Sequence, residues 1–364
     1  MTVWQSYTLT TYNDNVTLFW EKHMKIVVLA GGYSPEREVS LSSGSLIANA
    51  LMEKGHHVLL LDVYEGMDSL PSDPETLFLQ NGHYEHTVSD SVPDLEALKK
   101  RVGNGDALIG RNVETLCRLA DKVFLALHGS MGENGQLQAY LDSCGIRYTG
   151  SGYLGCALAM DKDVSKRLFR DAGVPTPDWQ YFRPKQDPLE GLLNSAPLPC
   201  VVKPCGGGSS VGVSMADTRE QLKAAVLEAA KWENAILVEQ KIVGREFTMG
   251  ILNGETLPPV EIIPNEGFYD YKNKYQGTTK EICPAQIPQK ITSEMSRLTK
   301  LGFEALRMQH YARFDFLLDG NGELWCLEAN ALPGMTPTSL LPQEAAAVGI
   351  SYSDLCELLL QTKN

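Results

Sequence analysis

A strand–helix–strand pattern near the start of the chain constrains its fold more than any other feature. The run KIVVLAGG (25–32) is typical of a buried strand that ends in a glycine turn, and HVLLLDV (57–63) is typical of a second buried strand. Between them, SLSSGSLIANALMEKG (40–55) has the pattern of a helix closed by Gly55. Such a unit predicts a parallel sheet with a helical crossover. The turn GGYSPEREVS lacks the spacing G-x-G-x-x-G and is therefore not a dinucleotide fingerprint.

The charge and the cysteines narrow the functional classes. The 364-residue chain has a formal net charge of −13. Binding to long duplex nucleic acid depends on neutralising phosphates with Lys and Arg, so nucleic acid is not an expected partner. The eight cysteines form no C-x-x-C motif and no zinc-like cluster with histidine. We interpret them as reduced thiols, which favours a cytoplasmic location.

The hydropathy of the chain predicts neither a membrane-spanning segment nor a signal peptide. No apolar run approaches the length of a membrane span, so a membrane is not an expected partner. Residues 1–23 lack the basic and apolar regions of a signal peptide. We expect them to be a poorly ordered N-terminal extension that precedes the first strand.

A glycine-rich stretch, KPCGGGSSVG (203–212), is predicted to be the tip of a β-hairpin. CVVK (200–203) reads as the strand before it and SVGVSMA (210–216) as the strand after it. The P-loop pattern G-x-x-x-x-G-K-[ST] occurs nowhere in the chain. Backbone N–H groups with Ser209 and Ser210 could cradle phosphate, and Lys203 could supply a positive charge. A surface hairpin that binds nothing is the alternative.

A second hairpin, ARFDFLLDGNGELWCLEAN (312–330), carries acidic residues on one face. Glu328 and Asn330 share a face because they are two residues apart on a strand, and pairing around DGNG brings Asp315 close to Glu328. Two carboxylates and an amide oxygen suit Mg²⁺ bound to nucleotide phosphates. Arg313 lies on the face of Asp315, where it could pair with it or stabilise developing negative charge. A solvated hairpin face is the alternative.

These motifs and several others together resemble the ATP-grasp superfamily, and specifically the D-alanine–D-alanine ligases. The segments that carry the resemblance stand in the family's order and span nearly everything from Met24 to Asn364: AGGYSPEREVSLSSG (30–44), ALHGSMGENGQLQ (126–138), YTGSGYLGCALAMDK (148–162), VVKPCGGGSSVGVS (201–214), VEQKIVGREF (238–247), FYDYKNKY (268–275), ARFDFLLD (312–319) and LEANALPGMTPTSLLP (327–342).

The resemblance implies an α/β, three-domain ATP-grasp fold with a Rossmann-like (pre-ATP-grasp) N-terminal domain. The expected division is an N-terminal domain over 24–149 with the first D-alanine site, a central subdomain over 150–239 with the glycine-rich loop, and a C-terminal subdomain over 240–364 with the Mg²⁺ and second D-alanine sites. A homodimer is also implied. The longer region 64–117 suggests an enlarged N-terminal domain for which the sequence predicts no purpose.

The implied reaction joins two D-alanine molecules at the expense of ATP. One carboxylate is phosphorylated, and the amino group of the second D-alanine attacks the acylphosphate, giving D-alanyl-D-alanine, ADP and phosphate for peptidoglycan. D-Serine, or less readily D-lactate, as second substrate is the close alternative. A catalytically silent ATP-binding protein is a more distant one, and the intact acidic hairpin argues against it.

The resemblance assigns roles around ATP and the metal. Its two Mg²⁺ ions, replaceable by Mn²⁺, would be held by Asp315, Glu328 and Asn330. The lysines that contact phosphate would be Lys162, Lys203 and Lys274. The other residues that contact the nucleotide would be Ser209, Ser210, Glu239, Ile242, Glu246 and Asn330.

The resemblance also assigns contacts to the amino acids. Glu36 would anchor the ammonium of the first D-alanine, beside His128. Glu36, Ser209 and Tyr275 would together tie the glycine loop to a lid segment. Arg313 and the Gly334 N–H would donate to the tetrahedral intermediate. Ser339 and Leu340 would contact the carboxylate of the second D-alanine. The chain departs from many relatives at Gln240 and at Ala331-Leu332, which flank these contacts.

Overall fold

The computed structural model describes residues 23–88, 93–208, 211–264 and 279–361. It divides into two compact units, residues 1–153 with 332–364 (unit 1) and residues 154–331 (unit 2). Unit 2 holds two separate sheets, whereas residues 332–364 group with unit 1 and not with the predicted C-terminal subdomain. The division into three domains stays a prediction.

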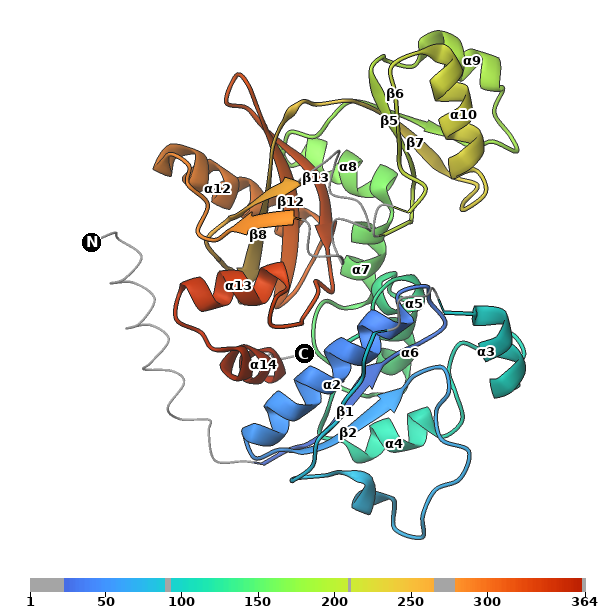
Figure 1. The fold of residues 1–364 in the computed structure, drawn as a ribbon, viewed down its shortest axis with the longest axis vertical. Coiled ribbons are helices and arrows are strands. Elements are labelled where there is room, and N and C mark those ends of the chain that lie inside the picture. Colours follow the sequence, from blue (N-terminus) through green and yellow to red (C-terminus); the bar gives the residue numbers. More distant parts are fainter. Residues whose placement is uncertain (1–22, 89–92, 209–210, 265–278, 362–364) are drawn as a thin grey trace. The chain divides into compact units, whose positions relative to one another are not determined.

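Unit 1 is built on the predicted parallel sheet, in the order β2-β1-β3. Its strands are β1 (Lys25–Ala30), β2 (His57–Asp62) and β3 (Lys122–Leu125). The crossover helix is α2 (Arg37–Glu53), which packs on β1 and β2 (Figure 1). A Cβ on Gly44 would lie 2.6 Å from the Cβ of Ala30, so glycine is what lets α2 approach the sheet so closely.

The remaining helices of unit 1 surround that sheet or follow it: η1 (Pro74–Leu77), α3 (Leu95–Val102), α4 (Val113–Leu119), α5 (Ser130–Glu133), α6 (Gln136–Ser143), α13 (Leu340–Ala347) and α14 (Tyr352–Leu360). Helix α14 packs on α2, where His56 Nε2 lies 2.6 Å from Glu357 Oε2. This buried contact fixes the C-terminal helix to the N-terminal sheet.

The first sheet of unit 2 is antiparallel, in the order β4-β7-β5-β6. Its strands are β4 (Trp179–Phe182), β5 (Cys200–Pro204), β6 (Ser214–Ala216) and β7 (Ile236–Gln240). Helices α9 (Leu189–Ser195) and α10 (Arg219–Ala229) lie on one side of it and share its apolar core (Figure 1). The glycine-rich hairpin is confirmed as β5–β6, but its second strand is shorter than predicted because it begins at Ser214.

The second sheet of unit 2 runs β11-β10-β8-β12-β13, with β9 paired to β8. The strands are β8 (Gly244–Leu252), β9 (Glu255–Thr256), β10 (Val260–Pro264), β11 (Thr279–Ile282), β12 (Tyr311–Asp319) and β13 (Leu324–Asn330). Helices α7 (Tyr153–Met160), α8 (Lys162–Asp171) and α12 (Gln289–Ala305) contribute to its apolar core. Within the described residues, none of the helices has the length and apolarity that crossing a membrane requires.

Candidate active site

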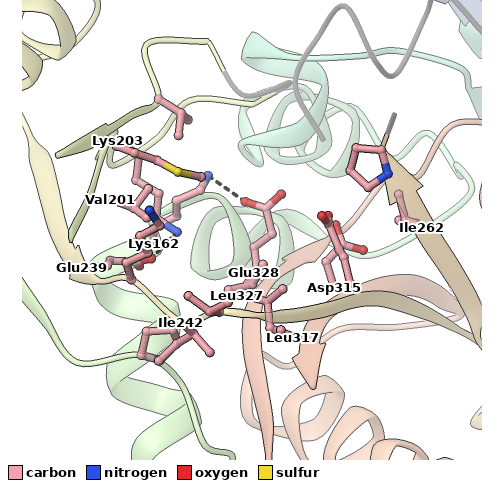
Figure 2. A pocket seen from close by; sticks show the side chains of 18 of the residues that line it. Lys162, Val201, Lys203, Glu239, Ile242, Ile262, Asp315, Leu317, Leu327 and Glu328 are labelled. Atoms are coloured by element: carbon pink, nitrogen blue, oxygen red, sulfur yellow. Dashed lines mark ion pairs between the residues drawn. The ribbon is translucent and has the colours of Figure 1, made fainter. Parts of the chain in front are cut away.

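A cavity of about 670 Å³ lies in unit 2 and is lined by residues from both of its sheets (Figure 2). A cavity of this volume suits a ligand of nucleotide size. It brings together most of the ATP- and metal-site residues that the sequence predicted: Lys162, Lys203, Glu239, Ile242, Glu246, Asp315 and Glu328.

The acidic hairpin has the predicted geometry. Asp315 on β12 faces Glu328 on β13, and Arg313 faces Asn330. Side chains on β12 and β13 alternate between the two faces of the sheet. The apolar ones enter the core, and the polar ones therefore point toward the cavity. The prediction that Asp315 and Glu328 meet across the hairpin is therefore confirmed.

Asp315 accepts hydrogen bonds from three neighbouring side chains. The Arg313 guanidinium donates from Nε to Oδ1 at 2.9 Å and from Nη2 to Oδ2 at 3.0 Å. Asn330 Nδ2 donates to Oδ2 at 3.1 Å. Thr248 Oγ1, on the neighbouring strand β8, donates to Oδ1 at 2.7 Å. These four bonds fix the plane of the carboxylate.

The donor set of the hairpin fits a hard divalent cation. Two carboxylates and an amide offer only oxygen ligands, as Mg²⁺ prefers. Among the described residues, no three His, Cys, Asp or Glu side chains form a metal cluster. Such a site leaves coordination positions for phosphate oxygens.

Lys162, the first residue of α8, connects the hairpin with the glycine-rich loop. Its Nζ lies 3.3 Å from Glu328 Oε2 and donates to the carbonyl of Gly207 at 2.6 Å. Burial alone would lower the pKa of Lys162, but the Glu328 carboxylate raises this pKa above its ordinary value. Lys162 therefore stays protonated, a fixed positive charge between loop and carboxylate.

Lys203 and Glu239 form an ion pair on the opposite wall, where Lys203 Nζ lies 2.8 Å from Glu239 Oε2. The other oxygen of Glu239 lies 3.0 Å from the Nζ of Lys166. Burial would raise the pKa of Glu239, but the two ammonium groups lower it below its usual value. The carboxylate is thus charged and held by two lysines on a strand where the sequence predicted a nucleotide contact.

Lys166 is a site residue that the sequence analysis missed. It is fully buried and donates to Thr176 Oγ1 at 2.6 Å. Burial lowers the pKa of Lys166 to about 8. The available signal was its spacing, because Lys162 and Lys166 stand one helical turn apart on α8 and share a face.

The base of the glycine-rich loop is held by the segment between α10 and β7. The N–H of Gly206 donates to Glu233 Oε2 at 2.7 Å, and the N–H of Cys205 donates to the carbonyl of Ala235 at 2.9 Å. Ser209 and Ser210, the hydroxyls predicted at its tip, lie outside the described residues. So do the predicted lid residues Lys274 and Tyr275.

The predicted amino-acid contacts of unit 1 lie at two places. Glu36 ends the turn after β1, and a Cβ on Gly129 would lie 2.6 Å from Glu36 Oε2, so glycine leaves room for this carboxylate. The Nδ1 of the neighbouring His128 lies 3.7 Å from Glu133 Oε1. Gly334 and Ser339 precede α13, and Leu340 is its first residue. Ser339 Oγ accepts the N–H of Thr336 at 3.1 Å.

Two family profiles match the chain. Residues 25–151 match the one described as D-ala D-ala ligase N-terminus, and residues 168–361 match the one described as D-ala D-ala ligase C-terminus. The chain belongs to the D-alanine–D-alanine ligase family. The fold class predicted from the sequence is thereby confirmed, because solved structures of the same family share the architecture.

Individual relatives agree with this membership. The chain is 43% identical to a D-alanine–D-alanine ligase of Pediococcus pentosaceus over 93% of this chain and 97% of that protein. It is 40% identical to that of Lacticaseibacillus casei, over 91% and 93%. The crystal structure of the Bacillus anthracis ligase complexed with ATP matches with a TM-score of 0.70 at 27% identity, covering 93% of this chain and 97% of that one. The VanG D-Ala:D-Ser ligase from Enterococcus faecalis matches with a TM-score of 0.72 at 25% identity, covering 93% and 99%.

Thr248 is a second residue that the sequence analysis missed, and it yields a prediction about the family's metal site. We expect Thr248→Val to weaken Mn²⁺ binding about tenfold, because its buried hydroxyl orients Asp315. The measurement is an electron paramagnetic resonance titration of free Mn²⁺ in the presence of ADP. Thr256→Val is the matched control, since Thr256 is also a buried threonine of this sheet but its hydroxyl pairs with Ser296. Equal affinities in both variants would contradict the role of Thr248.

Cys205, at the start of the glycine-rich loop, is expected to be chemically inert. Its thiol is buried, donates to Asp161 Oδ1 at 3.2 Å, and has its pKa raised by burial to about 12. A thiol with so high a pKa yields almost no thiolate at pH 8. We expect iodoacetamide to modify the partly exposed Cys144 well before Cys205, and peptide mass spectrometry measures both reactions. We also expect the Cys205→Ser variant to keep the activity of the wild-type protein. Alkylation of both thiols at one rate would contradict this.

Proposed function

We propose that this chain catalyses the ATP-dependent ligation of two D-alanine molecules to D-alanyl-D-alanine, with ADP and phosphate as the other products. The observation that carries the proposal is the cavity of unit 2. In a chain of this family, its Asp315–Glu328 pair lines a space of nucleotide size together with Lys162 and Lys203. The dipeptide would serve peptidoglycan synthesis, as in the family.

We propose that ATP lies in this cavity with its base and ribose toward Glu239, Ile242 and Glu246. Its phosphates would then meet Lys162 and Lys203. Both ammonium groups already lie beside carboxylates, and Lys162 also holds the glycine-rich loop. In the proposal, Ser209, Ser210 and Lys274 complete the phosphate contacts.

Asp315, Glu328 and Asn330 would hold Mg²⁺, two ions in the proposal, with Mn²⁺ as a replacement. When bound, the cation would neutralise charge on the phosphate oxygens. The oxygen-only donor set supports this assignment. Asp315 is oriented before any ligand arrives, because its two oxygens accept bonds from three different side chains.

The reaction proceeds in two transfers. An oxygen of the first D-alanine's carboxylate attacks the γ-phosphorus, the bond to the β-phosphate oxygen breaks, and ADP leaves. The amino group of the second D-alanine then attacks the acyl carbon and loses a proton. The C–O bond breaks, and phosphate departs with that carboxylate oxygen.

The protein's part is to position the substrates and stabilise negative charge. We propose that Arg313 and the Gly334 N–H donate to the oxyanion of the tetrahedral intermediate. Glu36, with His128 nearby, would receive the first D-alanine's ammonium, while Ser339 and Leu340 would contact the second carboxylate. Tyr275 and Ser209 would join Glu36 to close the site against water.

The test is a product assay on the purified chain with ATP and Mg²⁺. D-Alanine alone is expected to give D-alanyl-D-alanine and stoichiometric phosphate. The same assay with added D-serine or D-lactate distinguishes the alternative, and the VanG relative makes D-serine the more relevant of the two. Mixed products in excess of D-alanyl-D-alanine would overturn the proposed second substrate.

We further propose that the protein is a cytoplasmic homodimer, as the family resemblance implies. Sedimentation equilibrium of the purified chain is expected to give twice the monomer mass of 40.1 kDa. A monomer mass at all concentrations would overturn the dimer and leave the reaction untouched.

A further inference from the structure

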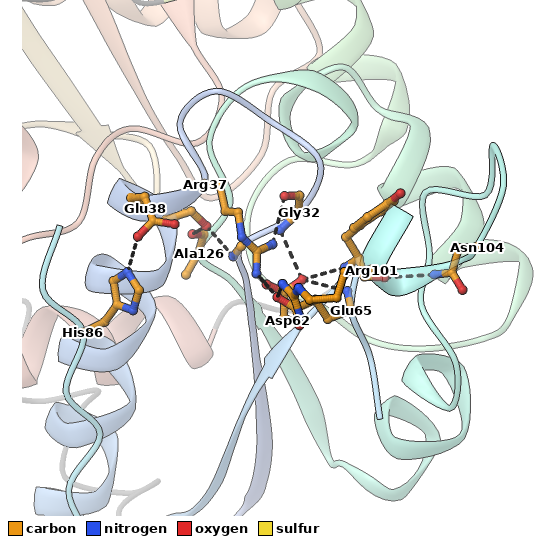
Figure 3. Close-up of polar contacts among 12 residues, drawn as sticks. Gly32, Arg37, Glu38, Asp62, Glu65, His86, Arg101, Asn104 and Ala126 are labelled. Carbon is orange, nitrogen blue, oxygen red and sulfur yellow. Dashed lines mark hydrogen bonds and ion pairs between the residues drawn. The ribbon is translucent and has the colours of Figure 1, made fainter. Parts of the chain in front are cut away.

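Arg37, which follows Glu36 in the sequence, is buried in unit 1 with only 7% of its surface exposed. Its Nη1 donates to the carbonyl of Gly32 at 3.1 Å. Its Nη2 lies 2.6 Å from Asp62 Oδ2 and also contacts Glu65 Oε1 (Figure 3). One guanidinium therefore joins the turn after β1 to the turn after β2.

Asp62, the last residue of β2, is fixed on its other side by backbone. Its Oδ1 accepts the N–H groups of Tyr64 at 2.8 Å and Glu65 at 3.0 Å. It also lies against Gly31, where a Cβ would come within 2.0 Å of Oδ2 and φ is +70°. Only glycine fits this contact, so the turn that leads to Glu36 lies directly on the carboxylate that holds Arg37.

Glu65 extends the network outward to α3. Arg101 donates from Nη1 to Glu65 Oε2 at 2.6 Å and from Nη2 to Oε1 at 2.9 Å (Figure 3). The hydrogen bond from Arg101, helped by the charge of Arg37, lowers the pKa of Glu65. The cluster balances two arginines against two carboxylates, which lets it remain charged while partly buried.

The segment around α3 makes a second set of contacts with the same turn. The ring of Tyr33 packs on that of Tyr64 with centroids 5.0 Å apart, and its hydroxyl donates to Glu96 at 3.3 Å. Asn104 Nδ2 donates to the carbonyl of Tyr64 at 3.0 Å. Part of the 64–117 region, for which the sequence predicted no purpose, thus covers the turn that carries Glu36.

We propose that Arg37 is a positioning residue that sets the Glu36 carboxylate for the ammonium of the first D-alanine, with α3 as its outer brace through Glu65. This inference rests on the proposed function. Glu36 packs against Gly129, so a shift of the turn by a fraction of an ångström moves the carboxylate off its position beside that glycine. Arg37 supplies the stiffness, because its planar fork reaches three acceptors on two turns.

The test is Arg37→Lys in the full chain. Lysine keeps the charge but cannot bridge three acceptors, so the turn loosens without leaving Asp62 unpaired. Initial rates with D-alanine varied at saturating ATP and Mg²⁺ give two D-alanine half-saturation constants, and rates with ATP varied at saturating D-alanine give the constant for ATP. We expect the constant for the first D-alanine to rise about tenfold. The constant for ATP and the rate at saturating D-alanine are expected to stay within about twofold of wild type.

Arg118→Lys is the matched control. Arg118 also joins a carboxylate, Glu114, to a backbone carbonyl, that of Cys144, within unit 1. We expect it to change neither constant. If the Arg37→Lys variant does not fold, the Glu65→Gln variant is used in its place. We expect it to raise the half-saturation constant for the first D-alanine about threefold.

The outcomes separate this inference from the proposed function. Wild-type protein that makes no dipeptide from D-alanine refutes the function. Active wild type, together with a folded Arg37→Lys or Glu65→Gln variant whose first D-alanine constant is unchanged, refutes the inference alone. An equal rise in the ATP constant also refutes it, because loss of general stability would then explain the defect.

Discussion

A Glu328→Gln variant is expected to lose Mg²⁺-dependent turnover by at least about 100-fold while its thermal unfolding temperature stays near that of wild type. Glutamine keeps the size of the side chain but removes the negative charge that lies opposite Asp315 on the hairpin. It also removes the carboxylate that raises the pKa of Lys162. The measurements are coupled phosphate release and differential scanning calorimetry.

The control for this variant is Glu323→Gln, in the turn of the same hairpin. Glu323 is exposed and lies outside the cavity. It tests whether any loss of negative charge on the hairpin is harmful, and we expect wild-type turnover. Full activity of Glu328→Gln would contradict the assignment of Glu328 as a metal ligand. Equal losses of turnover in both variants would show that the loss of negative charge on the hairpin explains the effect.

Replacing Arg313 by Met is expected to lower turnover by about 10²–10³-fold, the usual effect of removing one donor to an oxyanion. The structure adds a second expectation. Arg313 occupies both oxygens of Asp315, so a cation that binds there competes with the guanidinium. Mn²⁺ affinity in the variant, measured by titration with ADP present, is therefore expected to equal or exceed that of wild type.

This pairing of effects distinguishes two roles for Arg313. If the arginine acted mainly as a scaffold for Asp315, the variant would lose Mn²⁺ affinity and turnover together. Arg297→Met is the control, because Arg297 makes a similar two-bond contact with Glu294 on the surface of α12. We expect neither quantity to change there.

The acidic hairpin was the part of the site most accessible to sequence reasoning. The alternation of β12 and β13 and the turn DGNG determine which side chains share a face, and the observed pairing of Asp315 with Glu328 follows from these local rules. The parallel sheet of unit 1 was predictable for the same reason. Its buried strands and the crossover helix are short-range patterns.

The contacts that the sequence did not reveal depend on long-range pairing. Thr248 reaches Asp315 because β8 pairs with β12, and Lys166 on α8 forms an ion pair with Glu239 on β7, an element far away in the sequence. Neither contact can be predicted from the periodicity of a single strand or helix. The same holds for α14, whose contact with α2 groups residues 332–364 with unit 1.

The shorter strand β6 has a local cause. Gly212 has φ of +73°, and a Cβ there would lie 2.9 Å from both Pro204 and Trp232. A positive φ does not fit an extended strand, so regular pairing begins only at Ser214. The apolar alternation of 210–216 gave no sign of this turn.

The central claim is that ligation passes through D-alanyl phosphate, and an oxygen-transfer measurement tests it most directly. D-Alanine labelled with ¹⁸O in its carboxylate is incubated with the protein, ATP and Mg²⁺, and the released phosphate is analysed by mass spectrometry. The proposed chemistry predicts that each phosphate formed together with dipeptide carries a labelled oxygen from the carboxylate. Dipeptide accompanied by unlabelled phosphate would contradict the claim.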